Sequence, residues 1–499
     1  MILHTEGDIN RYYLQTLCMI FFPGASFPMD EEPGEDIPEL SIKLEKTENG
    51  YKATTSASFR GATAHDESEY VAGPADDDDH CRKFCIGTSV IRTLGKLMEY
   101  RPSWGILTGV RPSKVATEMM NAGLSKTKIR KILTQEFFVF PKKAILATDV
   151  AANERRIIGT PSPADCSIYV SIPFCPTRCA YCSFVSYTSK RLLSLIPEYV
   201  ERLNVDLKRV FAAAKEAGLN IKTVYFGGGT PTVLEADQIR TLLGTVCEGL
   251  GGHIPEEFTF ESGRPDTITR EKLQAIKDFG VKRISVNPQT LCPEVLEGIG
   301  RNHSVDDFYR AFSEAREVGI ETINTDLIAG LPGDNFNRFA MSVDGIIALH
   351  PENVTVHTFC VKRSSQFRQT ANIFSMRGGD AGKCVDYSQI KLQSAGYIPY
   401  YMYRQKNTVG NFENVGYSDP GKEGRYNIYM MEEVHSILAV GAGAVTKFVR
   451  LGGDNGEKTV IKRVFNHKYP YEYLEAGNCD GLIEEFRRFF EEHPICSGQ

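Results

Sequence analysis

The feature that most constrains the fold is an alternation of short β-branched runs with amphipathic helical stretches over residues 167–358. This pattern predicts an α/β fold in which a parallel sheet is built with right-handed helical crossovers. Six strand–helix units are expected to form a partial (β/α)6 barrel of the TIM type. The expected strands are Ser167–Ile172, Thr223–Phe226, Glu257–Glu261, Arg283–Val286, Thr322–Leu327 and Asn353–Thr358. The expected helices are Pro197–Ala217, Ala236–Gly249, Thr269–Phe279, Val305–Val318 and Asn335–Leu349.

The remainder of the chain suggests two further regions. We expect an N-terminal α+β region over residues 1–165, the barrel over residues 166–360, and a smaller C-terminal domain over residues 361–499 that covers the substrate. In the first region, two alternating runs flank Asn49-Gly50 and predict a hairpin. A helix is expected over Ile9–Phe21.

Cys81 and Cys85 lie four residues apart beside His80, so a second metal site is conceivable there. The apolar spacing around them agrees better with two buried thiols on an amphipathic helix. The following run, Arg101–Pro112, contains the only tryptophan of the chain and many turn-forming residues. It predicts a packed loop between helices.

Three cysteines directly follow the first barrel strand, in the run SIPFCPTRCAYCSF. Cys175, Cys179 and Cys182 are spaced C-x3-C-x2-C, and the prolines around the first of them favour a loop. Thiolates select iron–sulfur clusters or zinc. A zinc site needs a fourth ligand at matching spacing, and the next cysteine, Cys247, has no partner nearby. Three ligands suit a four-iron cluster with one iron open. The alternative of three buried thiols with no metal agrees poorly with three cysteines in eight residues.

Polar residues and glycines follow the other expected strands. Ligands of parallel α/β sheets collect at the carboxyl ends of the strands, so these positions are expected to share one rim. The positions are the Gly227–Thr232 turn GGGTPT after strand two, Glu261 after strand three, Gln289 after strand four, Asp326 near the end of strand five, and His357 near the end of strand six. This rim is the expected active site.

The rim residues each have a functional and a structural interpretation. In the GGGTPT turn, glycines permit close approach of a ligand and free N–H groups can bind a carboxylate, although a tight structural turn fits equally well. Glu261 and Asp326 could accept hydrogen bonds from a ribose diol or an amine, or serve as helix caps. Arg301 could bind a carboxylate with both guanidinium nitrogens, or be a solvated arginine.

Composition excludes several classes of protein. A net charge of -6 and a pI near 6.0 argue against general binding of nucleic acid. The sequence has no run of eighteen apolar residues, so no membrane span is expected, and its N-terminus lacks the pattern of a signal peptide. Thirteen cysteines in 499 residues do not resemble a disulfide scaffold. Together with an oxygen-sensitive cluster, they predict a cytoplasmic location.

The C-x3-C-x2-C spacing resembles that of the radical S-adenosylmethionine (SAM) superfamily. In that superfamily the open iron chelates SAM, and one electron splits SAM into methionine and a 5′-deoxyadenosyl radical. The runs YVSIPFC, CAYCSF, FGGGTPT, ESGRPDTI, SVNPQT, GIGRNHS and NTDLIAGLPG follow one order. Over roughly residues 165–450 they resemble oxygen-independent coproporphyrinogen III oxidases, most closely the HemZ-like branch.

This resemblance implies site residues, a reaction and partners. It implies that Cys175, Cys179 and Cys182 hold a [4Fe-4S] cluster. The positions implied for SAM binding are Tyr169, Tyr181, Gly228, Gly229, Thr230, Glu261, Gln289, Arg301 and Asp326. The family reaction converts two propionates of coproporphyrinogen III into vinyl groups, giving protoporphyrinogen IX in haem biosynthesis. A low-potential electron donor such as flavodoxin or ferredoxin is implied as a partner.

Two positions depart from the well-studied oxidases. Those enzymes have a fourth cysteine where this chain has Phe184, and a histidine where it has Ser171. The Phe184 pattern is shared with the related haem chaperones. Two alternative functions therefore stay open, namely a haem-binding or haem-transfer protein without oxidase activity and a radical SAM enzyme that acts on haem.

Aromatic and basic residues alternate after the barrel, in the run YIPYYMYRQKNTVGNFENVG. A flat anionic tetrapyrrole needs aromatic surface and cations for its propionates. Arg404 and Lys406 in this run, with Lys362 and Arg363 after the sixth strand, are weak candidates for substrate binding. A β-rich, partly exposed segment with scattered basic residues explains the same pattern.

Overall fold

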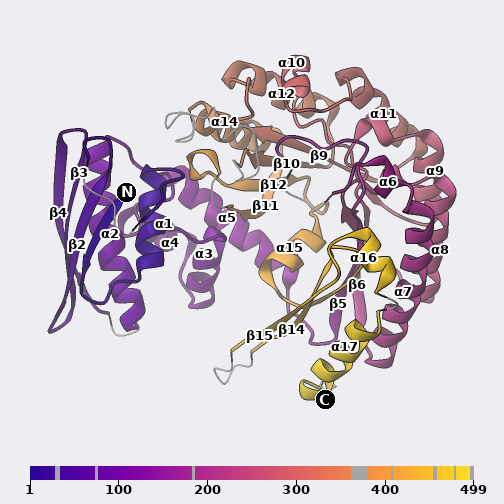
Figure 1. The fold of residues 1–499 in the computed structure, drawn as a ribbon, viewed down its shortest axis with the longest axis horizontal. Helices are drawn as coiled ribbons and strands as arrows, with labels where there is room; N and C mark the ends of the chain where they lie inside the picture. Colours follow the sequence, from indigo (N-terminus) through magenta and orange to yellow (C-terminus); the bar gives the residue numbers. More distant parts are fainter. Residues whose placement is uncertain are drawn as a thin grey trace. The chain divides into compact units, whose positions relative to one another are not determined.

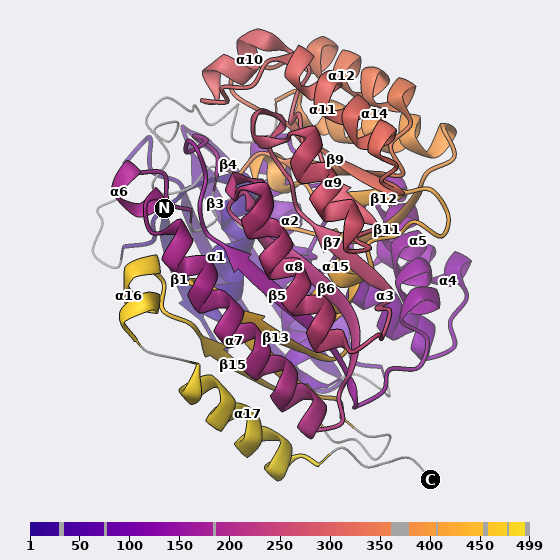
Figure 2. The same cartoon turned by 90° about the vertical axis from the view of Figure 1, so that its right-hand side faces the viewer.

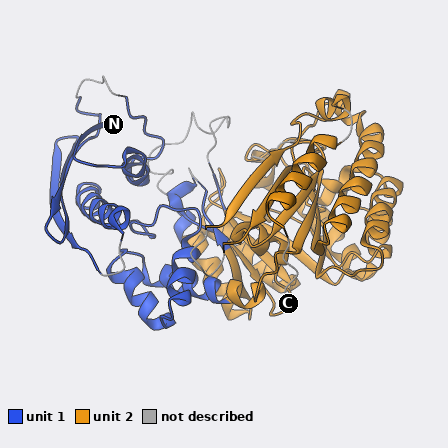
Figure 3. Ribbon diagram, turned by 90° about the horizontal axis from the view of Figure 1, so that it is seen from below, with its two compact units in different colours: residues 1–152, 358–382, 402–414 blue, residues 153–357, 383–401, 415–499 orange. Residues whose placement is uncertain are grey.

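The structure is a computed structural model of the 499-residue chain. It describes residues 1–28, 34–73, 77–182, 186–360, 379–405, 408–452, 458–476 and 479–494. The chain divides into two compact units, drawn in separate colours in Figure 3. Unit 1 comprises residues 1–152, 358–382 and 402–414, and unit 2 comprises residues 153–357, 383–401 and 415–499. The three expected domains remain a prediction.

Unit 1 begins with a four-stranded sheet in the order β1-β2-β3-β4. The first pair of strands is parallel and the other two pairs are antiparallel. The strands are β1 (Ile2–Glu6), β2 (Glu39–Thr47), β3 (Gly50–Phe59) and β4 (Ala62–Val71). Helices α1 (Arg11–Phe21) and α2 (Asp78–Met98) join them around one apolar core. The predicted hairpin is β2–β3, and the predicted first helix is α1, so both predictions are confirmed.

Cys81 and Cys85 lie on α2 with their side chains buried in this core. The Cys85 thiol contacts the backbone carbonyls of Tyr51 and Ser68, each at 3.3 Å. Buried thiols on an amphipathic helix were the preferred interpretation of this pair, and the structure agrees. The next helices are α3 (Pro112–Asn121), α4 (Lys126–Gln135) and α5 (Pro141–Ile158).

Unit 2 contains the barrel strands. They are β5 (Asp165–Ile172), β6 (Asn220–Gly228), β7 (Glu257–Phe260), β8 (Arg283–Ser285), β9 (Thr322–Ala329) and β10 (Asn353–Thr358). They lie in sequential order in the sheet, and the pairs from β5 to β9 are parallel. All six predicted strands are present, so the parallel α/β fold is confirmed. Among the described residues the sheet does not close on itself, which agrees with a partial barrel.

Helices cover this parallel sheet in chain order (Figures 1 and 2). They are α6 (Lys190–Leu193), α7 (Ile196–Glu216), α8 (Ala236–Leu250), α9 (Arg270–Asp278), α10 (Pro293–Gly298), α11 (Val305–Val318) and α12 (Phe336–Leu349). Helices α7, α8 and α9 contact one another in sequence, and α9 also contacts α11. Each of the five predicted barrel helices is observed. Short 3-10 helices follow β6 and β7, namely η1 (Pro231–Val233) and η2 (Pro265–Thr267).

The C-terminal part extends the same sheet. Its elements are α14 (Ala381–Ser394), β11 (Ile398–Tyr403), η4 (Val409–Asn411), β12 (Asn414–Ser418), α15 (Arg425–Glu432), β13 (Ser436–Val440), β14 (Val445–Arg450), β15 (Val460–Phe465), α16 (Pro470–Glu475) and α17 (Asp480–Glu492). Strand β13 pairs with β5 in parallel, and β14 and β15 follow in antiparallel order. The barrel's first strand is therefore an inner strand of the sheet. Within the described part of the chain, no helix is both long and apolar enough to cross a membrane.

Candidate functional site

The cysteine loop leaves β5 at Ile172 and is held at three points. The Cys175 N–H donates to the Tyr187 carbonyl at 3.1 Å, and the Tyr187 N–H donates to the Pro173 carbonyl at 2.8 Å. Farther along, the Ala180 N–H donates to the Ile299 carbonyl at 3.0 Å. The loop that carries the three cysteines is therefore fixed by backbone hydrogen bonds from other parts of unit 2.

The side chains of the three cysteines are mostly covered by the rest of unit 2. Cys175 and Cys179 are buried and Cys182 is half-buried. The Cys175 sulfur lies 3.2 Å from the Thr230 hydroxyl, and the Cys182 N–H donates to the Cys179 carbonyl at 3.1 Å. Burial raises the pKa of the Cys175 thiol. Because metals bind the thiolate, a bound cation would supply the stabilisation that burial removes.

Three soft thiol donors on one loop are a donor set that suits an iron–sulfur cluster. Among the described residues, no three His, Cys, Asp or Glu side chains converge to hold one metal ion. A four-iron cluster binds its cysteines through different irons, so its ligands need not converge on one point. Three thiols on one fixed loop therefore fit a [4Fe-4S] cluster.

The glycine turn at the end of β6 packs against the cysteine loop. The Gly229 N–H donates to the Ile172 carbonyl and the Thr230 N–H to the Phe174 carbonyl, both at 2.8 Å. A Cβ at Gly229 would lie 2.5 Å from the Phe174 carbonyl oxygen, so only glycine fits there. These two N–H groups hold the cysteine loop and are not free to bind a carboxylate, so for them the structure agrees with the interpretation as a tight structural turn.

The two rim carboxylates, Glu261 and Asp326, lie close enough for their charges to interact. Burial, with the charge of Asp326 next, raises the pKa of Glu261 to about 8. Asp326 accepts hydrogen bonds from the side-chain amides of Asn287 and Asn324, both at 2.8 Å. Its Oδ2 also lies 3.7 Å from the His357 ring. The structure thus brings the predicted residues Glu261, Asp326 and His357 into one region.

Three tyrosine rings stack inside the barrel beside Glu261. Tyr225 and Tyr426 have ring centroids 4.5 Å apart, and Tyr169 lies 6.2 Å from Tyr225 and 6.1 Å from Tyr426. A Cβ at Gly227 would lie 2.8 Å from the Tyr225 ring and 2.9 Å from a Glu261 oxygen. The glycine at this position is required because the rings and the carboxylate approach the backbone so closely.

Gln289 and Arg301 carry buried polar groups on the same side of unit 2. Gln289 has a positive φ of 68°, and its N–H donates to the Asp326 carbonyl at 3.0 Å. The Arg301 guanidinium donates to the Asn287 carbonyl at 2.8 Å. Within the described residues, neither the Gln289 Oε1 nor the Arg301 Nε has a hydrogen-bond partner. Buried polar groups rarely stay unsatisfied, so both atoms are candidates for contact with a ligand.

Glu261→Gln is expected to flatten the dependence of stability on pH in the ligand-free protein. The folded carboxyl has a pKa of about 8, above the unfolded value of about 4.3. As pH rises between these values, the unfolded state loses the proton first, so the free energy of unfolding falls by at most about 1.4 kcal/mol per pH unit. Above the folded pKa of about 8, this contribution to the free energy of unfolding is completely lost.

Urea unfolding at several pH values, followed by far-UV circular dichroism, checks this expectation. The difference between wild type and Glu261→Gln should change steadily from pH 5 to pH 8. Glu297→Gln, which alters an exposed glutamate on α10, is the control and should keep the slope of the wild type. Parallel slopes for wild type and Glu261→Gln would contradict a raised pKa at Glu261.

The weak substrate candidates lie elsewhere in the chain. Lys362, Arg363 and Lys406 lie outside the described residues. Arg404 belongs to unit 1 and is buried, with its guanidinium donating to the carbonyls of Leu107 and Gly109. It also lies 5.5 Å from the Trp104 ring. These contacts hold the tryptophan-containing loop, while a role of Arg404 in substrate binding stays a prediction.

Of the two positions that depart from the oxidases, the structure describes one. Phe184 lies outside the described residues. Ser171 is buried on β5, and its hydroxyl donates to the Ala442 carbonyl at 2.9 Å. A Cβ at Gly441, whose φ is 97°, would lie 2.6 Å from the Ser171 carbonyl oxygen. The small-residue turn after β13 therefore packs tightly against Ser171.

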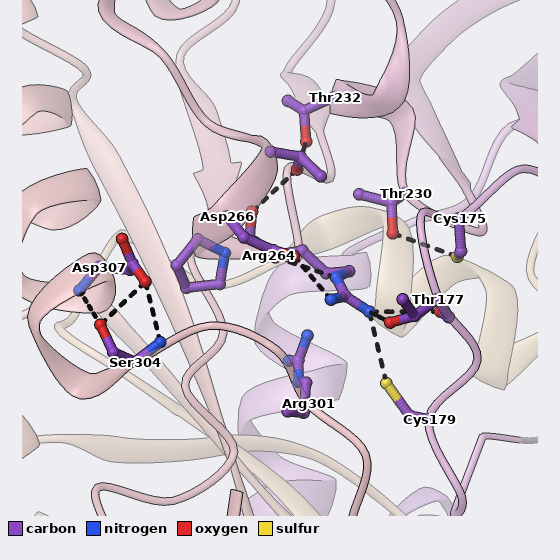
Figure 4. A network of polar contacts seen from close by, with 12 residues as sticks. Cys175, Thr177, Cys179, Thr230, Thr232, Arg264, Asp266, Arg301, Ser304 and Asp307 are labelled. Atoms are coloured by element: carbon purple, nitrogen blue, oxygen red, sulfur yellow. Dashed lines mark hydrogen bonds and ion pairs between the residues drawn. The ribbon is translucent and has the colours of Figure 1, made fainter. Parts of the chain in front are cut away.

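Several residues of the site were missed in the sequence. Arg264 lies three residues after Glu261 and contacts the cysteine loop at Thr177, and Asp266 pairs with Arg264 (Figure 4). His303 is buried beside Arg301 in sequence, and neither ring nitrogen has a partner among the described residues. The rule that ligands collect after strand ends could have identified Arg264. No local signal places Tyr426, because its partners lie some 200 and more residues away in the chain.

The chain is similar to known proteins of the radical SAM superfamily. A family model described as the radical SAM superfamily matches residues 169–345. The chain is 33% identical over 495 residues to the oxygen-independent coproporphyrinogen-III oxidase-like protein HemZ of Bacillus subtilis, with 96% of each chain covered. It is 28% identical over 324 residues to the heme chaperone HemW of Bacillus subtilis, covering 64% of this chain and 81% of HemW. Among solved structures, coproporphyrinogen III oxidase (HemN) from Escherichia coli shares 20% identity and a TM-score of 0.48, covering 66% of this chain and 73% of that chain.

Proposed function

The chain belongs to the radical SAM family of oxygen-independent coproporphyrinogen III oxidases and their HemZ-like relatives, and on this premise we propose that it decarboxylates coproporphyrinogen III. Two propionates would be oxidised to vinyl groups with loss of two CO2, giving protoporphyrinogen IX. One observation carries the proposal: the cysteine loop, the glycine turn and the polar rim residues all follow the carboxyl ends of neighbouring parallel strands. That edge is where sheets of this class bind their ligands.

The superfamily uses a [4Fe-4S] cluster and SAM. When bound and reduced, they supply the radical that removes a hydrogen atom from a propionate β-carbon. In our proposal Cys175, Cys179 and Cys182 hold the cluster. The residues proposed to bind SAM are Tyr169, Tyr181, Gly228, Gly229, Thr230, Glu261, Gln289, Arg301 and Asp326. Gly229 and Thr230 would do so through groups other than their N–H, which hold the cysteine loop. The protein groups position the cofactor against the substrate, and the cofactor carries the radical chemistry.

Two unsatisfied groups support the assignment of SAM to this region. The buried Arg301 guanidinium can pair with a carboxylate such as that of SAM, because its Nε has no partner in the described part of the chain. The buried Gln289 Oε1 is an open acceptor for a donor of the ligand. Glu261, with its pKa of about 8, can donate a hydrogen bond to a ribose oxygen while protonated and accept one once ionised.

The substrate and partners of this proposal follow from its chemistry. The substrate is a tetrapyrrole, and Lys362, Arg363, Arg404 and Lys406 remain proposed cations for its propionates. Reduction of the cluster needs a low-potential donor such as flavodoxin or ferredoxin. We also place the protein in the cytoplasm, where such donors and an oxygen-sensitive cluster are found.

A second candidate is haem binding or transfer without decarboxylation. It is favoured by the similarity to HemW of Bacillus subtilis, which is a heme chaperone. It is also favoured by Ser171, which stands where the oxidases have a histidine and whose hydroxyl is hydrogen-bonded to the Ala442 carbonyl at 2.9 Å. A chaperone of this kind would keep the cluster and the SAM site while lacking a substrate-directed group at that position.

An anaerobic turnover assay separates these functions. It combines reconstituted protein, SAM, a low-potential reductant and coproporphyrinogen III, with mass spectrometry of the tetrapyrrole. Loss of two CO2 units supports the oxidase. Formation of 5′-deoxyadenosine with an unchanged porphyrinogen overturns it and directs the test to haem. Haem that is then retained unchanged indicates transfer, whereas a linear tetrapyrrole indicates an enzyme that opens haem.

A further inference from the structure

The guanidinium of Arg264 is buried directly after β7, between a carboxylate and the cysteine loop (Figure 4). Its Nε donates to Asp266 Oδ1 at 3.0 Å and its Nη2 donates to Asp266 Oδ2 at 2.7 Å. Such a two-point pair holds the planar group in one orientation. Because arginine stays protonated in proteins, Arg264 is a fixed positive charge in the interior of unit 2.

The remaining nitrogen of Arg264 faces the cysteine loop. Nη1 donates to the Thr177 hydroxyl at 2.9 Å and to the Thr177 carbonyl at 3.3 Å. The same nitrogen lies 3.8 Å from the Cys179 sulfur, within the range of a hydrogen bond to sulfur. Thr177 lies between Cys175 and Cys179 in the sequence, so one guanidinium contacts both the loop and one of its thiols.

A buried cation at a ligand sulfur has a predictable electrostatic effect. Hydrogen bonds to the sulfurs and the net charge around a cluster set its reduction potential. Reduction adds one negative charge, and a nearby positive charge stabilises the reduced state, so it makes the potential more positive. The Asp266 carboxylate partly cancels this effect, because it pairs with the far side of the same guanidinium.

We propose that Arg264 is a positioning residue that orients the Cys179 segment and raises the reduction potential of the bound cluster, and that Asp266 moderates this effect. The inference rests on the cluster ligands assigned in the proposed function. Arg264 makes the cluster easier to reduce by a biological donor. Arg264 and Asp266 therefore act in opposite directions on one measurable quantity, although they form a single ion pair.

The test is a potentiometric titration of the reconstituted full-length protein, followed by electron paramagnetic resonance of the reduced cluster without substrate. Arg264→Gln is expected to shift the midpoint potential to more negative values. Asp266→Asn is expected to shift it to more positive values. Arg264→Lys keeps the positive charge but loses the two-point pair with Asp266. Its midpoint potential should therefore lie between those of wild type and Arg264→Gln. Arg240→Gln, at an exposed pair with Asp237 on α8, is the control and should leave the potential unchanged.

Opposite shifts for Arg264→Gln and Asp266→Asn at full iron content would support the proposal. A purely structural ion pair predicts instead that both variants lose iron or shift in the same direction, and either result overturns it. If Arg264→Gln does not fold, the comparison of Asp266→Asn with Arg264→Lys decides, since these two are also expected to differ in sign relative to wild type. Equal midpoint potentials in wild type and all variants would overturn the role of Arg264 and Asp266. Wild-type protein that takes up no cluster would instead overturn the assignment of the cysteines as cluster ligands.

Discussion

Cys179→Ala is expected to abolish SAM cleavage and to remove the visible absorption of the iron–sulfur cluster. Cys179 is the middle one of the three proposed ligands, and a four-iron cluster that is to keep one iron open for SAM has no protein ligand to spare. Loss of partners outside the ligand shell already costs about 10–100-fold in metal affinity or activity. Loss of a ligand itself should therefore lower 5′-deoxyadenosine formation by more than about 100-fold.

The measurements are iron and sulfide content, the visible spectrum and 5′-deoxyadenosine release under anaerobic conditions. Cys247→Ala is the matched control, because Cys247 lies on α8, away from the cysteine loop in sequence, and its thiol contacts the Phe279 carbonyl at 3.6 Å. It should keep wild-type iron content and SAM cleavage. A Cys179→Ala protein with normal iron and SAM cleavage would remove Cys179 from the ligand set, and another residue would then have to be sought as the third ligand.

Lys143→Met is expected to lower the free energy of unfolding of unit 1 by about 3–5 kcal/mol. The Lys143 ammonium lies 2.6 Å from Glu413 Oε1, and the two side chains are 2% and 0% exposed. The Trp104 indole N–H donates to the other carboxylate oxygen at 2.8 Å. Removing the lysine would leave a buried carboxylate without its hydrogen-bonded counter-charge, with the Arg404 guanidinium as the remaining cation that interacts with it, and this is the costly way to break such a pair.

The double variant Lys143→Met/Glu413→Gln should recover much of this loss, because a neutral amide still accepts from Trp104 and carries no buried charge. Trp104 is the only tryptophan of the chain, so its fluorescence during urea unfolding reports on unit 1. Lys126→Met, at the partly exposed pair with Asp149, is the control and should cost less than about 1 kcal/mol. Equal losses of unfolding free energy for Lys143→Met and Lys126→Met would show that the buried pair contributes no more to stability than the partly exposed pair.

Local patterns in the sequence predicted the barrel, because strands and helices alternate there and each has its own spacing of apolar residues. The run before Cys175 is β-branched and ends at a proline, so strand and loop were both evident from neighbouring residues. The order of such units along the chain then fixes their order in a parallel sheet. For this reason the strand ends, and with them Glu261, Gln289 and Asp326, could be assigned to one rim before any coordinates.

Contacts between distant parts of the chain could not be predicted in this way. Strand β13 lies beside β5 although more than two hundred residues separate them, and the short SILAV run has no periodicity that selects this neighbour. Tyr426 reaches the Tyr169 and Tyr225 rings for the same reason. Such pairings depend on how the whole chain packs, and a local pattern carries no information about them.

The sequence by itself determined the family, the cofactors and the parallel α/β fold, because each is expressed in short runs of adjacent residues. Only the tertiary structure decided how the polar groups are used. It showed that the N–H groups of Gly229 and Thr230 hold the cysteine loop, and that Arg264 points at Cys179. The physical reason is that a hydrogen bond depends on distance and direction between two groups, and these are set by packing and not by spacing along the chain.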